Sequence, residues 1–472
     1  MNKKTLNNLT YLYICIPIII FLLGWCKLYI SVPITLLIIF SFITRIEKYK
    51  QIDNLVKFTK NHKKEIVITI AIAIIYVFIS GIGGYVYQNP DHIYRNSIFK
   101  ELIDNKWPIY HTPQGVFDFD TIFVYYFALW LPAALIGKIF NLSLAYFALF
   151  ICCVLGVLLT FSYLKKYYKG KYYIPILLFI VFSGLDIIER FIYGNNFFEM
   201  LTSINHLEWI GSFQMSSFTT QLFWVYNQAI PAWLITMFIL NEKDNRYIGV
   251  IMAMSLLFCT LPAIGLIFLF IYKIFFESLT QKNKANIKNW AQKTFSWQNM
   301  FVGIPILLIN YLFLKSNLSG NQINFGAATY QYLNILIIYV FEFGIYYFIS
   351  YKYIDNKKLY WLSLISLLIC PLVRIGHSQD FCMRACIPGQ IVMFTFVLKT
   401  LYQTKKRNKN VFKILCIIIL LGSVTALNEI KRTNVNTGYN TKIEYTDLLN
   451  CYDSPNFYGN KNNSSFVKYI AK

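Results

Sequence analysis

Apolar runs of about 20 residues recur along the whole chain of 472 residues. A helix of that length crosses the hydrocarbon core of a bilayer, which is about 30 Å thick. Only 14% of the residues are charged, against roughly 25% in soluble domains. Because the bilayer core offers backbone groups no water, only helices and closed barrels cross it. The runs are continuous rather than alternating, so the sequence predicts an all-α fold, a polytopic bundle of transmembrane helices.

The distribution of Lys and Arg, which favour the cytoplasmic side, orders these runs along the chain. Spans near 10–26 and 29–44 form an N-terminal hairpin, and a third span, 66–86, leads into a long polar loop. Residues 121–138 are predicted as an interfacial or re-entrant helix, because a full crossing there would place the following lysines outside. The later spans, with a pair of short helices broken at Pro262, lie near 139–163, 172–189, 217–240, 247–277, 300–315, 333–351, 358–372, 385–402 and 411–427. The total is about 13 spans.

These spans divide the chain into three parts. Residues 1–65 hold the N-terminal hairpin and a basic inner loop, 66–427 form the main bundle, and 428–472 are a short polar tail outside the membrane that could pack as a cap. The outer-face loops are 87–120, 190–216 and 374–384. The abundance of Ile, Lys and Asn is typical of an AT-rich bacterial genome. We therefore predict a multi-pass protein of the bacterial cytoplasmic membrane, with its active face extracytoplasmic.

The formal net charge of +22 is the one feature that suggests nucleic acid as a partner. The lysines lie in short loops between spans, where they fix orientation and meet anionic lipid. Membrane lipids are thus the expected partners of these charges, and nucleic acid is not expected.

The first outer loop holds the strongest candidates for chemistry. A short amphipathic helix is predicted over 93–105, with Ile93, Phe99, Leu102 and Ile103 toward lipid and Arg95, Lys100 and Asp104 toward water. Asp91 precedes it, and two interpretations stay open: a helix cap worth about 1 kcal/mol, or a general base with His92 and Arg95 beside it. Asp118 and Asp120 are a second pair of candidate carboxylates, which could hold a metal ion or act as bases; a solvated turn is the alternative.

The second outer region combines amides, acids and rings. His206, Glu208 and Trp209 are followed by Trp224 and Gln228 inside a predicted span. Aromatic rings with amides are typical of carbohydrate-binding surfaces, while hydrogen bonding between membrane helices is the alternative. Just before it, Asp186 and Glu189 are costly acids near a span; they indicate either a functional site or a pair with Arg190.

The third outer loop gathers Arg374, His377, Asp380 and Arg384. Arginine binds phosphate oxygens with two parallel hydrogen bonds, so this loop suits a lipid phosphate. A simple i,i+4 pair of Asp380 with Arg384 is the alternative. Cys382 and Cys386 in the same loop suggest zinc, but the spacing and the lack of a second ligand pair speak against it, and we predict no metal ligands.

With the early span and the long outer loop, these residues give the chain an organisation that resembles the GT-C superfamily of polytopic membrane glycosyltransferases. Asp91-His92 after the span 66–86 lies where that family carries its catalytic acid. Trp107-Pro108, Tyr125-Tyr126 and Gly137-Lys138 resemble the transition from its loop to its bundle. The resemblance is architectural and covers 66–427. The chain departs from the family in its extra N-terminal hairpin and in lacking a second acid directly after Asp91.

The resemblance implies a hexosyltransferase. It would move a sugar from a polyprenyl-phosphate carrier to a lipid or cell-surface glycan acceptor, with Asp91 as general base. The residues implied to bind the departing phosphate, the sugar or the acceptor are Arg95, His206, Glu208, Trp209, Trp224, Gln228, Arg374, His377, Asp380 and Arg384. A divalent cation, Mg or Mn, is the one cofactor left open.

Two other classes of membrane protein stay open. One is a surface polysaccharide polymerase or ligase, which is expected to concentrate its polar residues in one large late loop, whereas the longest polar loop here is early. The other is a lipid-linked oligosaccharide flippase or another transporter, which would place polar groups at mid-membrane on several helices.

Overall fold

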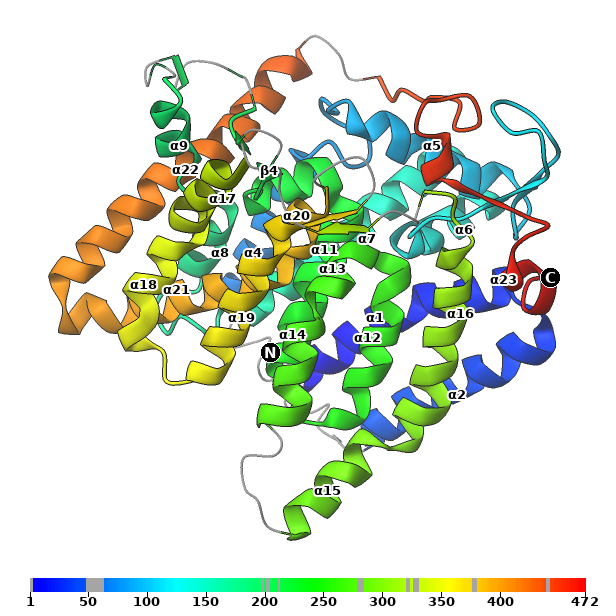
Figure 1. The fold of residues 1–472 in the computed structure, drawn as a ribbon, viewed down its shortest axis with the longest axis horizontal. Coiled ribbons are helices and arrows are strands. Elements are labelled where there is room, and N and C mark those ends of the chain that lie inside the picture. Colours follow the sequence, from blue (N-terminus) through cyan, green and yellow to red (C-terminus); the bar gives the residue numbers. More distant parts are fainter. Residues whose placement is uncertain are drawn as a thin grey trace.

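The computed structural model describes residues 3–47, 63–194, 196, 199–200, 204, 206–210, 213–277, 284–319, 323–325, 331–375, 380–438 and 442–472. The chain is predominantly helical, and eight helices in these ranges are long and apolar enough to cross a membrane (Figure 1). They are Lys4–Trp25, Leu28–Ile46, Leu142–Leu164, Phe218–Asn241, Thr260–Glu277, Ile287–Lys315, Tyr332–Tyr353 and Lys409–Thr437. An all-α, multi-pass membrane protein is confirmed at this level, while the count of 13 spans stays a prediction.

The N-terminal half is built from long helices joined by short strands and turns. Its elements are α1 (Lys3–Trp25), α2 (Leu28–Glu47), α4 (Lys63–Phe78), α5 (Asp91–Asp104), β1 (Tyr110–His111), β2 (Thr121–Phe123), the 3₁₀ turn η1 (Ala128–Trp130), α6 (Leu131–Ile139), α7 (Leu142–Leu164), α8 (Tyr173–Val181), α9 (Asp186–Ile192), β3 (Trp209–Ile210), β4 (Phe213–Gln214) and α11 (Phe218–Asn241).

The C-terminal half contains several irregular helical turns. Its elements are the 3₁₀ turns η2 (Asn245–Tyr247), η7 (Tyr351–Tyr353), η8 (Cys370–Leu372) and η9 (Ser454–Asn456), the π-helical turns η3 (Tyr272–Glu277), η4 (Gln298–Gly303) and η6 (Tyr339–Gly344), the helices α12 (Ile248–Phe258), α13 (Thr260–Gly265), α14 (Ile267–Ile271), α15 (Lys284–Thr294), α16 (Ile304–Lys315), α17 (Tyr332–Ile338), α18 (Ile345–Ser350), α19 (Lys357–Ile369), α20 (Asp380–Ala385), α21 (Ile387–Arg407), α22 (Lys409–Thr437) and α23 (Ser465–Tyr469), and the strands β5 (Ile323–Phe325), β6 (Val373–Ile375) and β7 (Tyr458–Asn460).

The predicted N-terminal hairpin is present as α1 and α2, which pack against each other. Arg45 near the end of α2 forms a buried ion pair with Glu242, directly after α11. Its guanidinium also lies 4.3 Å from the ring centroid of Tyr247. A buried pair of this kind fixes the position of the hairpin against the main bundle.

In two predicted spans the helix ends or breaks earlier in the chain than expected. The helix within 66–86 stops at Phe78, and Gly81, Gly83 and Gly84 follow with φ of 85°, 91° and 77°. Such positive φ angles are strained for residues with a Cβ, so these glycines carry the turn toward α5. The break in 247–277 lies at Cys259 (φ −159°, ψ 76°) and not at Pro262, which occupies the first turn of α13. Proline is tolerated there because the first N–H groups of a helix have no partner within it.

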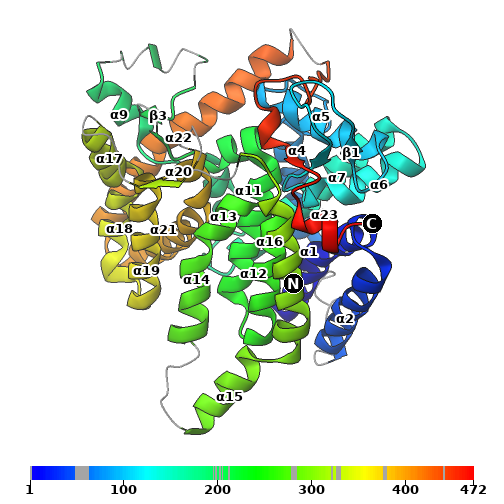
Figure 2. The same cartoon turned by 45° about the vertical axis from the view of Figure 1, so that its right-hand side comes forward.

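The C-terminal segment packs against the outer loop that follows α4. Helix α22 runs through residue 427 and ends only at Thr437. After it, β7 pairs antiparallel with β2, which pairs with β1, so the sheet order is β1-β2-β7. The segment then reaches α1, where the amide of Lys472 donates to the carbonyl oxygen of Trp25 at 3.0 Å. Figure 2 shows this red segment crossing in front of α5 and β1.

The predicted interfacial stretch 121–138 is not one continuous helix. It begins as strand β2, turns at η1 and continues as the nine-residue helix α6. Helix α6 packs on α5 and α7. The loop between β2 and η1, residues 124–127, thereby reaches the interior beside α11.

Candidate functional site

A kink in α11 positions the candidate site. Val225 leaves helical geometry (φ −135°, ψ 37°) within this otherwise buried helix. The carbonyl oxygen of Phe223 accepts two side-chain hydrogen bonds next to the kink, from Asn89 Nδ2 at 2.7 Å and from His92 Nε2 at 2.9 Å. Because kinks leave backbone groups without helical partners, these two side chains satisfy an acceptor that would otherwise be costly to bury. They also fix the start of α5 against α11.

His92 is therefore a positioning residue rather than a proton carrier. Its side chain is 1% exposed, and it stacks near Tyr226 with ring centroids 5.6 Å apart. Burial, together with the charge of Arg95, lowers the pKa of His92 to about 3. A neutral ring donates from Nε2 to Phe223, which leaves this nitrogen no role as an acid or base near neutral pH.

Asp91 is the first residue of α5, directly after Pro90. No side chain caps this helix, so the interpretation of Asp91 as a cap is wrong. Its carboxylate instead pairs with Arg95 at 3.1 Å and keeps 42% of its side chain exposed. Arg95 is buried, and its Nε donates to Oδ1 of Asn227 on α11 at 3.4 Å. The sequence prediction placed Arg95 toward water and Phe99 and Leu102 toward lipid, whereas all three face the protein interior.

Two adjacent tyrosines connect α11 with the third outer loop. Tyr125 and Tyr126 stack with ring centroids 3.9 Å apart, and their hydroxyls lie 2.8 Å apart. The Tyr126 oxygen also accepts from Arg384 Nη1 at 3.0 Å and lies 3.3 Å from Gln228 Nε2. Arg384 in turn pairs with Asp380 at 2.8 Å, as the i,i+4 alternative predicted.

Three buried polar atoms around these residues have no hydrogen-bond partner: Arg384 Nε, Asn227 Nδ2 and Gln228 Oε1. Turning the Gln228 amide over exchanges its two ends, but one of them still lacks a protein partner. Burial by itself lowers the pKa of Arg384, yet Asp380, Tyr126, Tyr125 and Asp91 raise it, so the guanidinium keeps its charge. Buried polar atoms of this kind are normally satisfied by water or ligand.

We call the residues Asp91, Arg95, Tyr126, Asn227, Gln228 and Arg384 the Asp91 cluster. It combines a half-exposed carboxylate with two buried guanidinium groups and several unused donors and acceptors. Such a set can accept a proton at one point and hold an anion at another. The elements that supply it are α5, the loop before η1, α11 and α20.

A cavity of about 310 Å³ lies on the next turn of α11, lined by Tyr87, Ile204, His206, Trp209, Trp224, Arg432 and Asn436. His206 Nδ1 lies 2.7 Å from Oε1 of Glu429, and Trp224 Nε1 donates to the other oxygen at 3.0 Å. The Arg432 guanidinium lies 5.0 Å from the centroid of the Trp224 ring. Rings, an arginine and an amide around one cavity suit a sugar or a phosphate group.

The carboxyl groups near this cavity affect the protonation of His206. Burial lowers the pKa of His206, but the hydrogen bond to Glu429 and the charges of Glu208 and Glu429 raise it above its ordinary value overall. Glu208 lies fully buried behind the cavity, where desolvation raises its pKa to about 7. It accepts hydrogen bonds from Gln214, Ser217 and Thr220. Glu208 therefore organises the wall of the cavity and is not one of the residues that line it.

The other predicted residues lie elsewhere. Asp118 is exposed, and Asp120 pairs with Lys461 of the C-terminal segment at 3.4 Å rather than with a residue of the Asp91 cluster. Arg374 lies in β6, opposite Asn324 of β5. His377 lies outside the described residues. Cys382 and Cys386 are buried free thiols, and in the part of the chain that the structure describes they belong to no group of metal-ligating side chains.

The sequence analysis did not identify two pairs of residues that contact the Asp91 cluster or the cavity. Tyr125 and Tyr126 were assigned to the membrane interface, although their hydroxyls reach the buried Arg384. Glu429 and Arg432 were assigned to the tail, although α22 carries them into the cavity wall. The signal for the second pair was their spacing of three residues, which continues the helical period beyond residue 427.

Comparisons with known proteins give no further guide, since no family model, no curated protein and no solved structure matches this chain.

Proposed function

We propose that this chain is a membrane glycosyltransferase that moves a sugar from a polyprenyl-phosphate carrier to a hydroxyl of a lipid or surface glycan. The observation that carries the proposal is the Asp91 cluster, in which a half-exposed carboxylate lies with the buried Arg95 and with Arg384, whose side chain is 14% exposed. Transfer from a lipid phosphate needs both functions at once: a base for the acceptor and cations for the leaving phosphate.

Asp91 is the proposed general base. It is the exposed member of the cluster, at 42%, and its partner Arg95 holds the carboxylate at the start of α5. In the proposed step, Asp91 takes the proton of the acceptor hydroxyl, whose oxygen bonds to the anomeric carbon of the sugar. The bond from that carbon to the carrier phosphate breaks, and its electron pair leaves with the phosphate.

Arg384 and Arg95 are the proposed phosphate ligands. The Nε of Arg384 is buried without a partner, while its other nitrogens reach Tyr126 and Asp380. A phosphate oxygen would satisfy that N–H, and Nδ2 of Asn227 offers a further donor to it, while Oε1 of Gln228 can accept from a sugar hydroxyl. Charge-assisted bonds of this kind are roughly twice as strong as neutral ones, so they favour the departing phosphate. The cavity beside Trp224 and Arg432 is large enough for a sugar ring or part of the carrier.

The test is a profile of lipid-linked sugars in cells that lack the gene and are rescued by variants. Wild type should clear an accumulated polyprenyl-phosphate sugar and restore a surface glycan. Asp91→Asn should fail, because losing a general base slows a reaction by about 10²–10⁴-fold. Asp104→Asn is the matched control: it lies on the same helix, is half-exposed and pairs with Lys100. All variants are compared at equal amounts of folded protein in the membrane.

The outcomes separate the classes of function. Full rescue by Asp91→Asn would refute the proposed base. Accumulation of completed lipid-linked glycan units on the outer leaflet would contradict the proposal and indicate a polymerase or ligase. Completed units trapped on the inner leaflet would replace it by a flippase. Arg384→Gln should impair rescue by about 10²–10³-fold, as expected for loss of one preorganised donor to a developing charge, and Arg384→Lys should recover only part of it because lysine lacks the planar fork.

A further inference from the structure

A second group of acids lies on elements that do not contribute to the Asp91 cluster. It consists of Asp186 and Glu189 on α9 and Glu342 on the π-helical turn η6. One carboxylate oxygen of each lies within 4.8 Å of the others. The three residues are 1%, 0% and 3% exposed. Oxygens that share one Mg²⁺, Mn²⁺ or Ca²⁺ lie at comparable separations, because metal–oxygen distances are about 2.0–2.6 Å.

The backbone is shaped to bring these acids together. Glu342 lies in a π-helical turn, a rare element that is frequent at functional sites. A Cβ on Gly184 would lie 2.1 Å from Oε2 of Glu342, so only glycine lets this carboxylate lie against the loop before α9. On the other side of the loop, a Cβ on Gly422 of α22 would lie 2.7 Å from the carbonyl oxygen of Gly184. The loop is thus held between η6 and α22.

These carboxylates lack the donors that buried acids normally have. Asp186 Oδ2 accepts from the hydroxyls of Ser183 at 2.9 Å and Thr425 at 2.8 Å. Asp186 Oδ1, both oxygens of Glu189 and Oε2 of Glu342 have no partner. No ion pair joins the three acids to a Lys, Arg or His of the described residues. Arg190, the partner that the sequence suggested, donates instead to the carbonyl oxygens of Leu207 at 2.9 Å and His206 at 3.4 Å.

Other buried acids of the same chain show the contrast. Glu208 is 1% exposed and accepts hydrogen bonds from a backbone amide and two side chains. Glu242 is 5% exposed and is bonded by Arg45, Asn7 and two backbone amides. A buried charge without such partners is strongly unfavourable. Four unused carboxylate oxygens in one place therefore indicate a positive ligand.

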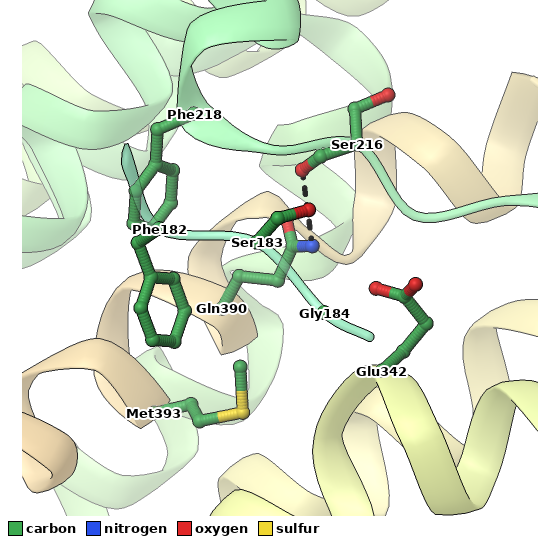
Figure 3. Close-up of a pocket in the computed structure, with 8 residues that line it drawn as sticks. All are labelled: Phe182, Ser183, Gly184, Ser216, Phe218, Glu342, Gln390 and Met393. Atoms are coloured by element: carbon green, nitrogen blue, oxygen red, sulfur yellow. Dashed lines mark hydrogen bonds between the residues drawn. The ribbon is translucent and has the colours of Figure 1, made fainter. Parts of the chain in front are cut away.

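A small cavity beside Glu342 gives room for one further ligand. It has a volume of about 10 Å³ and is lined by Phe182, Ser183, Gly184, Ser216, Phe218, Glu342, Gln390 and Met393. Figure 3 shows the Glu342 carboxylate on one side of the group and the polar ends of Ser183 and Gln390 facing it, with the two phenylalanines behind. About this volume holds one water molecule.

We propose that Asp186, Glu189 and Glu342 bind one divalent cation through their oxygens, with a water molecule in the adjacent cavity available as a further ligand. Three carboxylates and a water are the oxygen ligands that Mg²⁺, Mn²⁺ and Ca²⁺ prefer. The cation would tie α9 to η6 and, through Thr425, to α22. The proposal is independent of the proposed glycosyl transfer, since none of these acids belongs to the Asp91 cluster.

The test is Mn²⁺ binding to the full-length chain, purified in detergent and freed of metal with a chelator. The electron paramagnetic resonance signal of free Mn²⁺ measures the bound fraction. Wild type should show one saturable site from which Mg²⁺ or Ca²⁺ displaces Mn²⁺. Glu189→Gln and Glu342→Gln, which keep the shape and remove a charge, should each weaken binding at least about tenfold. Asp104→Asn, which removes an exposed acid, should bind like wild type.

Two results would overturn the proposal. One is a wild type without a saturable Mn²⁺ site, as expected if the acids are simply protonated. The other is a pair of glutamine variants that bind as tightly as wild type. A measurement on wild type alone covers variants that fail to fold: Fe²⁺ in place of Mn²⁺, with ascorbate and peroxide, should cleave the chain within 183–190 and 339–344. Cleavage only elsewhere would also overturn the proposal.

Discussion

Replacing His92 by leucine should make the protein less stable than wild type near neutral pH and more stable than wild type in acid. In wild type the ring is 1% exposed, donates to the carbonyl oxygen of Phe223 at 2.9 Å and has its pKa lowered by burial to about 3. Leucine fills a similar volume without a donor or a titrating group. Asn89 still donates to the same carbonyl oxygen at 2.7 Å, so that oxygen is not left without a partner.

The size of the effect follows from two opposing contributions. The lost hydrogen bond destabilises the variant by about 1 kcal/mol at every pH. In wild type, the unfolded histidine has a pKa of about 6.5 and binds a proton that the folded ring rejects. The free energy of unfolding of wild type therefore falls as the pH drops from about 6.5 toward 3, by about 1.4 kcal/mol for each pH unit. The variant lacks this contribution.

Wild type should be the more stable protein by about 1 kcal/mol above about pH 7, and the two should be equal between about pH 5.5 and 6. Below that the variant should be more stable. Thermal unfolding in one detergent, followed by tryptophan fluorescence from pH 4.5 to 8, measures the difference. Titration of all other groups cancels in the comparison.

Asn89→Leu is the control for this experiment. It removes the other side chain that donates to the carbonyl oxygen of Phe223, and it removes no titrating group. Its deficit relative to wild type should therefore be the same at every pH. Parallel stability curves for wild type and His92→Leu over the whole range would refute the assignment of His92 as a buried neutral positioning residue.

Three further predictions concern stability and share the same unfolding assay. Arg45→Met should destabilise the protein by about 3–5 kcal/mol because it leaves Glu242 charged and buried. Lys165→Met, which breaks a partly exposed pair with Glu65, should destabilise it by at most about 1 kcal/mol. Equal effects would contradict the role of the buried pair of Arg45 with Glu242 in fixing the N-terminal hairpin. Gly194→Ala should destabilise the protein by about 1–2 kcal/mol from its φ of +80° alone. Gly115→Ala should destabilise it more, because the added Cβ would also lie 2.3 Å from the carbonyl oxygen of Leu449. An equal loss of stability in the two variants would mean that the C-terminal segment does not lie against Gly115. Phe466→Ala should destabilise the protein by about 3–5 kcal/mol, since the residue is 0% exposed and its ring centroid lies 5.1 Å from that of Phe313. Tyr469→Ala, at a residue that is 58% exposed, should change the stability by no more than about 0.5 kcal/mol. A small effect of Phe466→Ala would argue against the C-terminal segment as part of the core.

Local patterns were sufficient for several elements. The long apolar runs predicted α2 and α11 to within three residues and the end of α1 to within one, although α1 begins seven residues earlier than predicted. Length and continuous hydrophobicity determine a spanning helix by themselves. The helix after Pro90 was predicted at 93–105 and found at Asp91–Asp104. Its period of apolar residues was correct, but the side on which they lie was not. A period tells which residues share a face, and only the neighbours decide whether that face meets lipid or protein.

Irregular backbone was the first thing that local patterns did not determine. The kink at Val225 and the π-helical turn at Glu342 lack a local sequence signal. The break in 247–277 had one in Pro262, but the sequence did not show that the helix breaks at Cys259, three residues earlier. The kink at Val225 is stabilised by side chains from a distant segment, because Asn89 and His92 satisfy the carbonyl oxygen of Phe223.

The sequence by itself determined the membrane class, the approximate spans and the candidate residues Asp91, Arg95 and Arg384, because these depend on local composition and on the chemistry of single side chains. Only the tertiary structure decided which candidates meet. Arg384 reaches Tyr126 across 258 residues of chain, Glu429 joins His206 across 223, and Glu342 lies within 4.8 Å of Asp186. Contacts so distant in sequence leave no local trace, since they are set by the packing of whole helices against one another.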